Sequence, residues 1–528
     1  MTDRLGSIWE AVAARPRWAA LFLGALGATA YPPLGLWPIG LLALAALVAL
    51  LHGASSWKQA ALIGWLFGWT HLTLANNWIA TAFTYQAEMP AALGWVAVPL
   101  LCIYLAVYPA LAAIIAWLAA RKTNLIIFGA LFAACWIVTE WLRSWVFTGY
   151  PWPPLGLMLL GGWEAPGIAR LLPWIGTYAL SGLALVIAGG LAWLASDRRW
   201  GAFLATGVIL VVLMVWPAPK QEEGKVRFSL IQPLLKQEEL NDPRKFEEQF
   251  VRLARLTMPS RDEPRLVLWP ESAVPDYLEE GYPQRYYDRM TAAADPAFAR
   301  QRIGALLGEE SILLTGLVHL DIGEQDGVRR ALSARNAVSA ITPEGDITAT
   351  YAKAHLVPYG EYLPMRGLLE PIGLSRLVAG TIDYLPGPGP RSFDLGRHGK
   401  AGIQICYEIV FSGQVVDRGD RPDYIFNPSN DGWFGSWGPP QHLAQARMRA
   451  IEEGLPVLRA TTTGISAVVD ADGVVRSSIG MGRADRIDGY VPPAKPPTLF
   501  ARLGNLLPLG WALVLAAASL VAMRRWPV

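Results

Sequence analysis

Eight apolar stretches, each about as long as a membrane-spanning helix, constrain this chain more than any other feature. A spanning helix needs about 20 mostly apolar residues. Seven stretches precede residue 220 and one lies beyond residue 500; their centres are near residues 25, 44, 68, 105, 135, 182, 209 and 514. We therefore expect a membrane α-helical bundle.

Acidic residues separate this membrane part from a soluble part. The chain has 43 Asp and Glu residues, but those before residue 220 are only Asp3, Glu10, Glu88, Glu140, Glu164 and Asp197. Charged side chains are costly inside a bilayer. The sequence predicts a membrane domain with seven transmembrane helices at residues 1–220, a soluble domain at residues 221–497, and a final transmembrane helix with a short tail at residues 498–528.

Basic residues mark alternate connections between the expected spans. They precede the first span and follow the second, fourth, sixth and eighth: Arg4, Arg15, Arg17, Lys58, Arg121, Lys122, Arg198, Arg199, Arg524 and Arg525. The positive-inside rule then places both termini in the cytoplasm and residues 221–497 on the opposite side. An alternative for the first stretch is a cleavable signal peptide ending near Ala30, which leaves the location of the soluble domain unchanged.

Charge, histidines and cysteines exclude several classes of function. The net charge is +2 and no dense run of Lys and Arg occurs, so nucleic-acid binding has little support. The six histidines show no metal-ligand spacing, so no metal or other cofactor is expected. Cys102 and Cys135 lie in apolar runs, where cysteine is usually a small hydrophobe. Cys406, in the polar part, is the candidate for cysteine chemistry.

The residues between the seventh and eighth stretches have the pattern of an α/β domain. Strands are predicted at residues 226–232, 265–270, 311–320, 400–406, 424–427 and 465–470. Helices are predicted at residues 242–258 and from Pro440 to Gly454. Turn residues predict hairpins at 343–346 and 470–473.

Three polar residues stand at the ends of predicted strands, where α/β folds present side chains to a crevice. Glu271 follows Leu-Trp-Pro, Lys353 follows Thr-Tyr-Ala, and Cys406 follows Ile-Gln-Ile. Each residue alone is compatible with an ordinary surface or core position. Together they suit nucleophilic catalysis, because a thiol with a pKa near 8.5 is mostly protonated at neutral pH and needs a base.

The sequence around these residues resembles the nitrilase superfamily in three ordered motifs. They are Trp-Pro-Glu ending at Glu271, Tyr-Ala-Lys ending at Lys353 and continuing into His-Leu-Val-Pro-Tyr-Gly-Glu, and Ile-Cys-Tyr-Glu around Cys406. The middle motif, residues 427–434 and the eight apolar stretches resemble the apolipoprotein N-acyltransferase family over essentially the whole chain. The resemblance implies a nitrilase-like four-layer α-β-β-α sandwich inserted before the last transmembrane helix.

The resemblance also implies an acyltransferase with Glu271, Lys353 and Cys406 as its catalytic triad. Glu271 is then the base, Cys406 attacks a phospholipid ester, and Lys353 with the backbone N–H of Tyr407 stabilises the oxyanion. The N-terminal amine of a diacylglyceryl-cysteine apolipoprotein attacks the resulting thioester in a ping-pong cycle. The implied donor is phosphatidylethanolamine, and the implied setting is lipoprotein maturation in the bacterial inner membrane, with a periplasmic catalytic domain. The oligomeric state is open, with a monomer as the default expectation.

Three further residues follow from the resemblance. Glu361 is expected to orient Lys353, and Glu408 is the acidic residue that follows the nucleophile and its aromatic neighbour. For both glutamates the alternative is an ion pair that only fixes a loop. Asn336 lies in a strand, where the alternative is that it satisfies backbone groups.

Two features outside the triad carry open interpretations. Residues 365–385 are either a mobile apolar arm that dips into the membrane to admit lipid or a loop packed on the domain. Glu140 and Arg143, at i and i+3 in the fifth stretch, are expected to pair or to lie near the far interface, with head-group binding as a further hypothesis.

Two other functions compete with acyl transfer. A membrane-tethered amidase would use the same triad with water as the acceptor, but it has no use for eight spans and an apolar arm. A non-catalytic membrane scaffold or transporter has no need of an intact triad. The sequence therefore favours a transferase.

Overall fold

The computed structural model divides into two compact units. The residues it describes are 10, 12–85, 90–220, 222–259, 263–372 and 382–525. One unit, here the helical unit, comprises Met1–Ala80, Ala92–Ala218 and Pro497–Val528. The other, here the α/β unit, comprises Thr81–Ala91 and Pro219–Pro496. The short segment Thr81–Ala91 thus belongs to the α/β unit although it lies between two of the apolar stretches.

A helix passes through each of the eight apolar stretches. These helices are α2 (Pro16–Ala28), α3 (Trp37–His52), α4 (Trp57–Ala75), α6 (Gly94–Leu105) continued by α7 (Val107–Ala120), α8 (Leu125–Arg143), α9 (Leu172–Ser196), α10 (Trp200–Val215) and α17 (Leu506–Arg525). In the described part of the chain, four segments are long and apolar enough to cross a membrane: Ala91–Ala120, Leu125–Arg143, Ile168–Ser196 and Leu506–Arg525. The other four stretches form helices that are shorter or less apolar.

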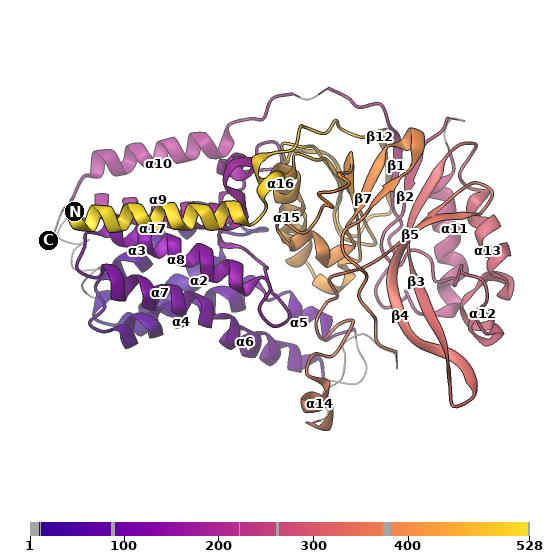
Figure 1. Ribbon diagram of the computed structural model, residues 1–528, viewed down its shortest axis with the longest axis horizontal. Helices are drawn as coiled ribbons and strands as arrows, with labels where there is room; N and C mark the ends of the chain where they lie inside the picture. The colour runs from indigo at the N-terminus through magenta and orange to yellow at the C-terminus, as the bar shows by residue number, and fades with distance from the viewer. Residues whose placement is uncertain are drawn as a thin grey trace. The chain divides into compact units, whose positions relative to one another are not determined.

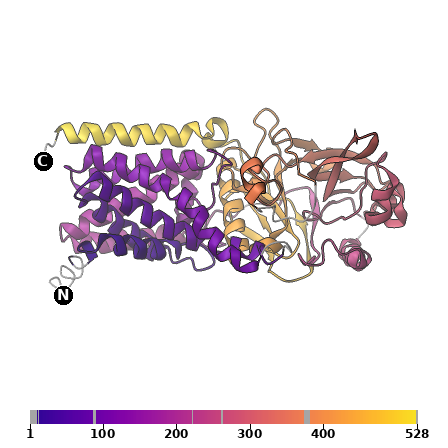
Figure 2. The same ribbon diagram turned by 90° about the horizontal axis from the view of Figure 1, so that it is seen from below.

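Small residues let the helices of this unit approach closely. Gly129 on α8 faces Gly189 on α9, and a Cβ added to Gly129 would lie 2.9 Å from the Cα of Gly189. Such close approach gives van der Waals contact, which drives helix association where no hydrophobic effect operates. Helix α17, yellow in Figures 1 and 2, packs on α8 and α9. The last apolar stretch is therefore part of the same bundle as the earlier ones.

Glu140 and Arg143 form a buried ion pair at the end of α8, which confirms the pairing interpretation. Arg143 Nη2 lies 3.6 Å from Glu140 Oε1, and both side chains are buried. Arg143 also donates to the carbonyl oxygens of Trp152 and Pro153, while Glu140 accepts from the N–H of Leu155. The pair therefore ties α8 to the segment that follows it, and head-group binding stays a hypothesis.

The α/β unit contains two six-stranded sheets. The strand order is β12-β1-β2-β3-β4-β5 in the first sheet and β11-β10-β9-β8-β7-β6 in the second. The strands are β1 (Arg227–Gln232), β2 (Leu266–Leu268), β3 (Ile312–Gln325), β4 (Val328–Ile341), β5 (Ile347–Ala352), β6 (Ser392–Asp394), β7 (Lys400–Ile403), β8 (Tyr424–Ser429), β9 (Val457–Thr461), β10 (Ser466–Val469), β11 (Val475–Ile479) and β12 (Asp485–Tyr490). Three neighbours in each sheet are parallel, namely β1 to β3 and β7 to β9.

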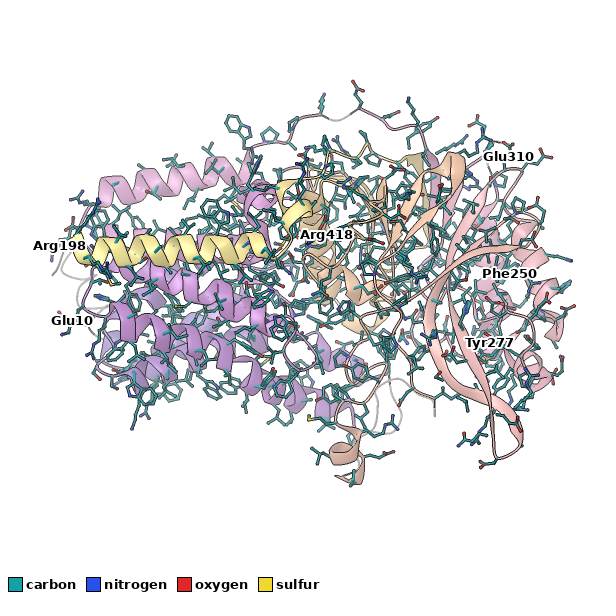
Figure 3. The ribbon with its side chains drawn as sticks, viewed as in Figure 1. Glu10, Arg198, Phe250, Tyr277, Glu310 and Arg418 are labelled. Atoms are coloured by element: carbon teal, nitrogen blue, oxygen red, sulfur yellow. The ribbon has the colours of Figure 1, made fainter. Side chains whose placement is uncertain are left out.

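Helices cover the outer face of each sheet and produce four layers (Figure 1). Helices α11 (Phe246–Thr257) and α13 (Pro296–Gly304) pack on the first sheet through an apolar core, against which Phe250, labelled in Figure 3, also packs. Helix α15 (Gly438–Glu453) packs on β9 and β10 of the second sheet. The inner faces of the sheets meet where Gln232 of β1 accepts hydrogen bonds from Thr461 and Ser466. The predicted α-β-β-α sandwich is confirmed.

The predicted elements differ from the structure mainly at their ends, whereas six strands, β4, β5, β6, β9, β11 and β12, were not predicted. The helix expected at residues 242–258 is α11 with one preceding 3-10 turn. The helix expected from Pro440 begins at Gly438 and ends at Glu453, before Gly454, whose φ is +66°. Both expected hairpins are present, between β4 and β5 and between β10 and β11.

The expected arm at residues 365–385 is described only in part. A short helix, α14 (Arg366–Leu369), forms its beginning, and the exposed side chains of Met365 and Leu368 are apolar. Residues 373–381 lie outside the described residues. The arm therefore stays a prediction.

Candidate active site

The three expected catalytic residues leave the two sheets at points that bring their side chains together. Glu271 lies just beyond β2 and Lys353 directly follows β5, both in the first sheet. Cys406 lies just beyond β7 of the second sheet and begins a 3-10 helix, Cys406–Val410. All three are buried, with exposed fractions of 5%, 1% and 4%. The site therefore lies between the sheets, where water is largely excluded.

Hydrogen bonds hold both oxygens of the Glu271 carboxylate. Oε1 accepts from Asn336 Nδ2 at 2.6 Å and lies 3.7 Å from Lys353 Nζ. Oε2 accepts from the backbone N–H of Asn430 at 2.7 Å. The carboxylate is therefore fixed in direction before a substrate arrives, as an efficient general base requires.

Glu361 pairs with Lys353, which is the contact expected from the resemblance. Lys353 Nζ donates to Glu361 Oε1 at 3.0 Å, and Glu361 Oε2 accepts from the N–H of Val357 at 2.7 Å. Asn336 also donates to Glu361 at 2.9 Å, so its one amide nitrogen bridges both glutamates. Burial, the largest influence, opposes the charge on Lys353, but Glu361 and Glu271 together outweigh it and raise the pKa of Lys353. The ammonium therefore stays charged.

The pKa of the Cys406 thiol is high enough that the thiol stays protonated until a base removes its proton. Burial raises the pKa of Cys406 well above its ordinary value, the negative charge of Glu271 raises it further, and Lys353 opposes this rise. A thiol in this state is a weak nucleophile. The backbone of Cys406 has a φ of +51°, which non-glycine residues rarely adopt and which recurs at functional turns.

Glu408 joins the loop after Lys353 to the turn that carries Cys406. Its Oε1 accepts from the hydroxyl of Tyr351 and the N–H of Ala354, both at 2.7 Å, and its Oε2 accepts from the N–H of Ile405 at 2.7 Å. These contacts are hydrogen bonds, whereas the alternative reading of the sequence was an ion pair. Next to Glu408, the buried ring of Tyr407 packs edge-on against Phe411 at 5.1 Å.

Glu408 is expected to make the stability of the fold depend on pH. Burial raises its pKa from 4.5 to about 7, although the hydrogen bonds from Tyr351, Ile405 and Ala354 oppose the rise. A raised folded-state pKa stabilises the fold below pH 4.5, and this stabilisation, about 3 kcal/mol, is lost as the pH rises through about 7. The melting temperature of wild type minus that of Glu408→Gln should therefore fall between pH 5 and pH 8 in detergent. A difference that does not vary with pH would contradict this assignment.

Four polar residues at the site were missed by the sequence prediction. Asn430 donates to Glu271, His442 bonds to the carbonyl of Cys406, and Asp431 and Arg459 contact His442; all four are buried. A signal was present for Asn430 and Asp431, because a polar run, Asn-Pro-Ser-Asn-Asp-Gly, begins at Asn427, the last residue of the predicted strand at residues 424–427. No comparable local signal marked His442 or Arg459.

Comparisons with known proteins agree with this division of the chain. Residues 23–190 match the apolipoprotein N-acyltransferase N-terminal domain, and residues 237–483 match the carbon-nitrogen hydrolase family. Apolipoprotein N-acyltransferases of Rhodopseudomonas palustris and Bradyrhizobium diazoefficiens are 34% and 35% identical to the chain, covering 96% of it and 95% and 94% of their own lengths. A solved Saccharomyces cerevisiae member of the nitrilase superfamily is 19% identical over 52% of this chain and 93% of its own, with a TM-score of 0.36.

The strongest of these similarities extends through both units. The Rhodopseudomonas and Bradyrhizobium relatives align over nearly the full length, so the helical unit and the α/β unit occur in the same combination in each. Each unit also matches its own family over most of its length. The chain belongs to the apolipoprotein N-acyltransferase family.

Proposed function

We propose that the chain transfers an acyl chain from a membrane phospholipid to the N-terminal amine of diacylglyceryl-cysteine apolipoproteins. One observation carries this proposal: a buried thiol, carboxylate and ammonium converge in one unit, while the other unit contains helices able to cross a membrane. The names of the relatives support the same reaction. Phosphatidylethanolamine is the proposed donor, and a monomer is the proposed working form.

In the first half-reaction, Cys406 Sγ attacks the ester carbonyl of the phospholipid while Glu271 takes the thiol proton. The negative charge that develops on the carbonyl oxygen is stabilised by the Lys353 ammonium and the N–H of Tyr407. The tetrahedral intermediate collapses, the C–O bond breaks, and Glu271 returns its proton to the departing lysophospholipid alkoxide. The acyl chain remains on Cys406 as a thioester, which survives because the buried site excludes water.

In the second half-reaction, the apolipoprotein amine attacks the thioester. The same oxyanion donors act again, Glu271 accepts the amine proton, and the thiolate leaves as the amide forms. Glu271 then reprotonates Cys406, which restores the starting state. The fixed position of Glu271 between Asn336 and Asn430 supports this double use, because one carboxylate must serve as acid and base in both steps.

We also propose that the α/β unit lies on the extracytoplasmic side of the bacterial inner membrane and that both termini are cytoplasmic. The alternation of basic residues in the connections supports this orientation. Apolipoproteins would meet the enzyme on that side after export.

Initial-rate kinetics test the proposal. With purified enzyme, phospholipid in mixed micelles and a diacylglyceryl-cysteine peptide, double-reciprocal plots at several peptide concentrations should be parallel, and acyl-peptide should accumulate with an equal amount of lysophospholipid. Intersecting lines would contradict the covalent intermediate. Release of free fatty acid at the rate of lysophospholipid formation would instead identify a hydrolase.

A further inference from the structure

The backbone carbonyl oxygen of Cys406 receives two hydrogen bonds from buried side chains. His442 Nε2 lies 3.0 Å from this oxygen, and Asn427 Nδ2 donates to it at 3.5 Å. A carbonyl oxygen only accepts, so the proton of the His442 ring must lie on Nε2. His442 is fully buried, and no substrate contact is assigned to it.

Arg459 is fully buried on β9 and contacts both Asn427 and His442, the two residues that bond to the carbonyl of Cys406. Its Nη1 donates to the side-chain oxygen of Asn427 and, at 2.9 Å, to the hydroxyl of Ser429. Its Nη2 donates to Asp431 Oδ1 at 2.8 Å and Oδ2 at 2.7 Å, and it lies 2.9 Å from His442 Nδ1, which is also 2.9 Å from Asp431 Oδ1. A single guanidinium therefore orients both side chains that bond to the carbonyl of Cys406.

The protonation states agree with this arrangement. Burial and the charge of Arg459 lower the pKa of His442, whereas Asp431, whose Oδ1 lies 2.9 Å from His442 Nδ1, raises it. His442 Nε2 donates to the carbonyl of Cys406 whether the ring is neutral or charged. Burial opposes the charge on Asp431, but Arg459 and His442 outweigh it and hold the pKa of Asp431 below its ordinary value. Asp431 thus neutralises the buried cation and completes the network.

We propose that His442 is a positioning residue that polarises the peptide group between Cys406 and Tyr407 and thereby strengthens the Tyr407 N–H as an oxyanion donor. The carbonyl of Cys406 and the N–H of Tyr407 belong to one conjugated peptide group. A hydrogen bond to the oxygen draws electron density from the nitrogen and makes its N–H a better donor, as in chains of cooperative hydrogen bonds. The inference rests on the proposed function, because it assigns His442 to the oxyanion of thioester formation.

Acylation and alkylation of Cys406 together distinguish this role of His442 from a purely structural role. Acylation of Cys406 passes through an oxyanion, so it depends on the Tyr407 N–H. Alkylation by iodoacetamide joins the sulfur to a saturated carbon and releases iodide, without an oxyanion. A residue that only maintains the turn or tunes the thiol affects both reactions, whereas His442 is expected to affect acylation alone.

The test compares His442→Asn with His442→Gln. A Gln side chain can place an N–H where His442 has Nε2, whereas the shorter Asn side chain cannot reach the carbonyl of Cys406. We expect His442→Asn to lower the rate of acyl-enzyme formation from phospholipid about tenfold, less than the loss of about 100-fold to 1,000-fold typical of a deleted oxyanion donor. We expect His442→Gln to stay within about threefold of wild type. Both variants should be alkylated by iodoacetamide within about threefold of the wild-type rate.

Three outcomes overturn the inference. Two of them count against the role of His442 alone, and the third also counts against the proposed function. Acylation of His442→Asn at the wild-type rate, or an equal fall in acylation and alkylation, overturns the role of His442 alone. Failure of the wild type to form any acyl-enzyme overturns the proposed function and this inference with it. If His442→Asn does not fold, Arg459→Lys must show the same loss of acylation with alkylation retained, because lysine cannot hold both Asn427 and Asp431.

Discussion

Glu271→Gln is expected to slow formation of the acyl-enzyme by about 1,000-fold at neutral pH, within the range typical of general acid–base catalysis. The amide cannot take the thiol proton, and burial already holds the pKa of Cys406 well above its ordinary value. The remaining rate should rise about tenfold for each pH unit, because only the thiolate present at equilibrium can then react. Rapid-quench time courses followed by intact mass measure both effects.

Glu280→Gln is the matched control for this substitution. Glu280 has 71% of its side chain exposed and pairs with Arg300 away from the triad, so the variant should acylate at the wild-type rate. Wild-type acylation by Glu271→Gln would show that another group is the base.

Lys353→Met is expected to lower acylation by about 100-fold to 1,000-fold, the loss typical of removing one oxyanion donor. It should also destabilise the fold by about 3–5 kcal/mol, because Glu271 and Glu361 would lose their buried cation. Both glutamates also share the amide of Asn336, so their charges would then repel each other across one donor. Acylation rates and thermal unfolding in detergent measure the two effects separately.

Adding Glu361→Gln to Lys353→Met distinguishes a catalytic role of Lys353 from a role in stability alone. Lys353→Met combined with Glu361→Gln removes the surplus negative charge and should recover most of the lost melting temperature. Acylation should stay as low as in the single variant, since no ammonium faces the oxyanion. Recovery of both stability and acylation would mean that Lys353 serves the fold only.

Part of the convergence of the triad was predictable because strand ends are visible in the sequence. Short apolar runs ending in Glu271 and Cys406 predict buried strands, and each residue does lie just beyond a strand with parallel neighbours. The carboxyl ends of parallel strands form the crevice of an α/β fold. The approach of Glu271 and Cys406 follows from this placement. The position of Lys353 does not, because it follows β5, an edge strand with an antiparallel neighbour. The bridge that Asn336 makes between two glutamates does not follow either, since it depends on the side-chain rotamers.

The longest hairpin of the α/β unit was missed although a signal for it exists. Strands β3 and β4 pair from Leu313 opposite Ile341 to Gln325 opposite Val328. Asp326 and Gly327 form the turn between them, both at positive φ, as a two-residue hairpin prefers. The predicted strand ended at residue 320, whereas β3 continues to Gln325, and β4 was not predicted.

The buried network behind Cys406 lay beyond any local pattern. Asp431, His442 and Arg459 lie on a 3-10 turn, on α15 and on β9, and their charges taken one at a time predict exposed residues. Only the fold shows that their side chains are hydrogen-bonded to one another in the interior.

The segment Thr81–Ala91 was also beyond prediction from sequence, because its place in the α/β unit depends on tertiary contacts. One of these is the edge-to-face contact of Tyr85 with Trp433, with ring centroids 5.9 Å apart.

The most direct test of the thioester mechanism is the intact mass of the purified protein after incubation with phospholipid, before and after neutral hydroxylamine. Wild type should gain the mass of one acyl chain, lose it to hydroxylamine, and lose it equally to a diacylglyceryl-cysteine peptide that becomes acylated. Cys406→Ala should show no hydroxylamine-labile increment. A wild type that gains no mass while still acylating the peptide would contradict a covalent intermediate on Cys406.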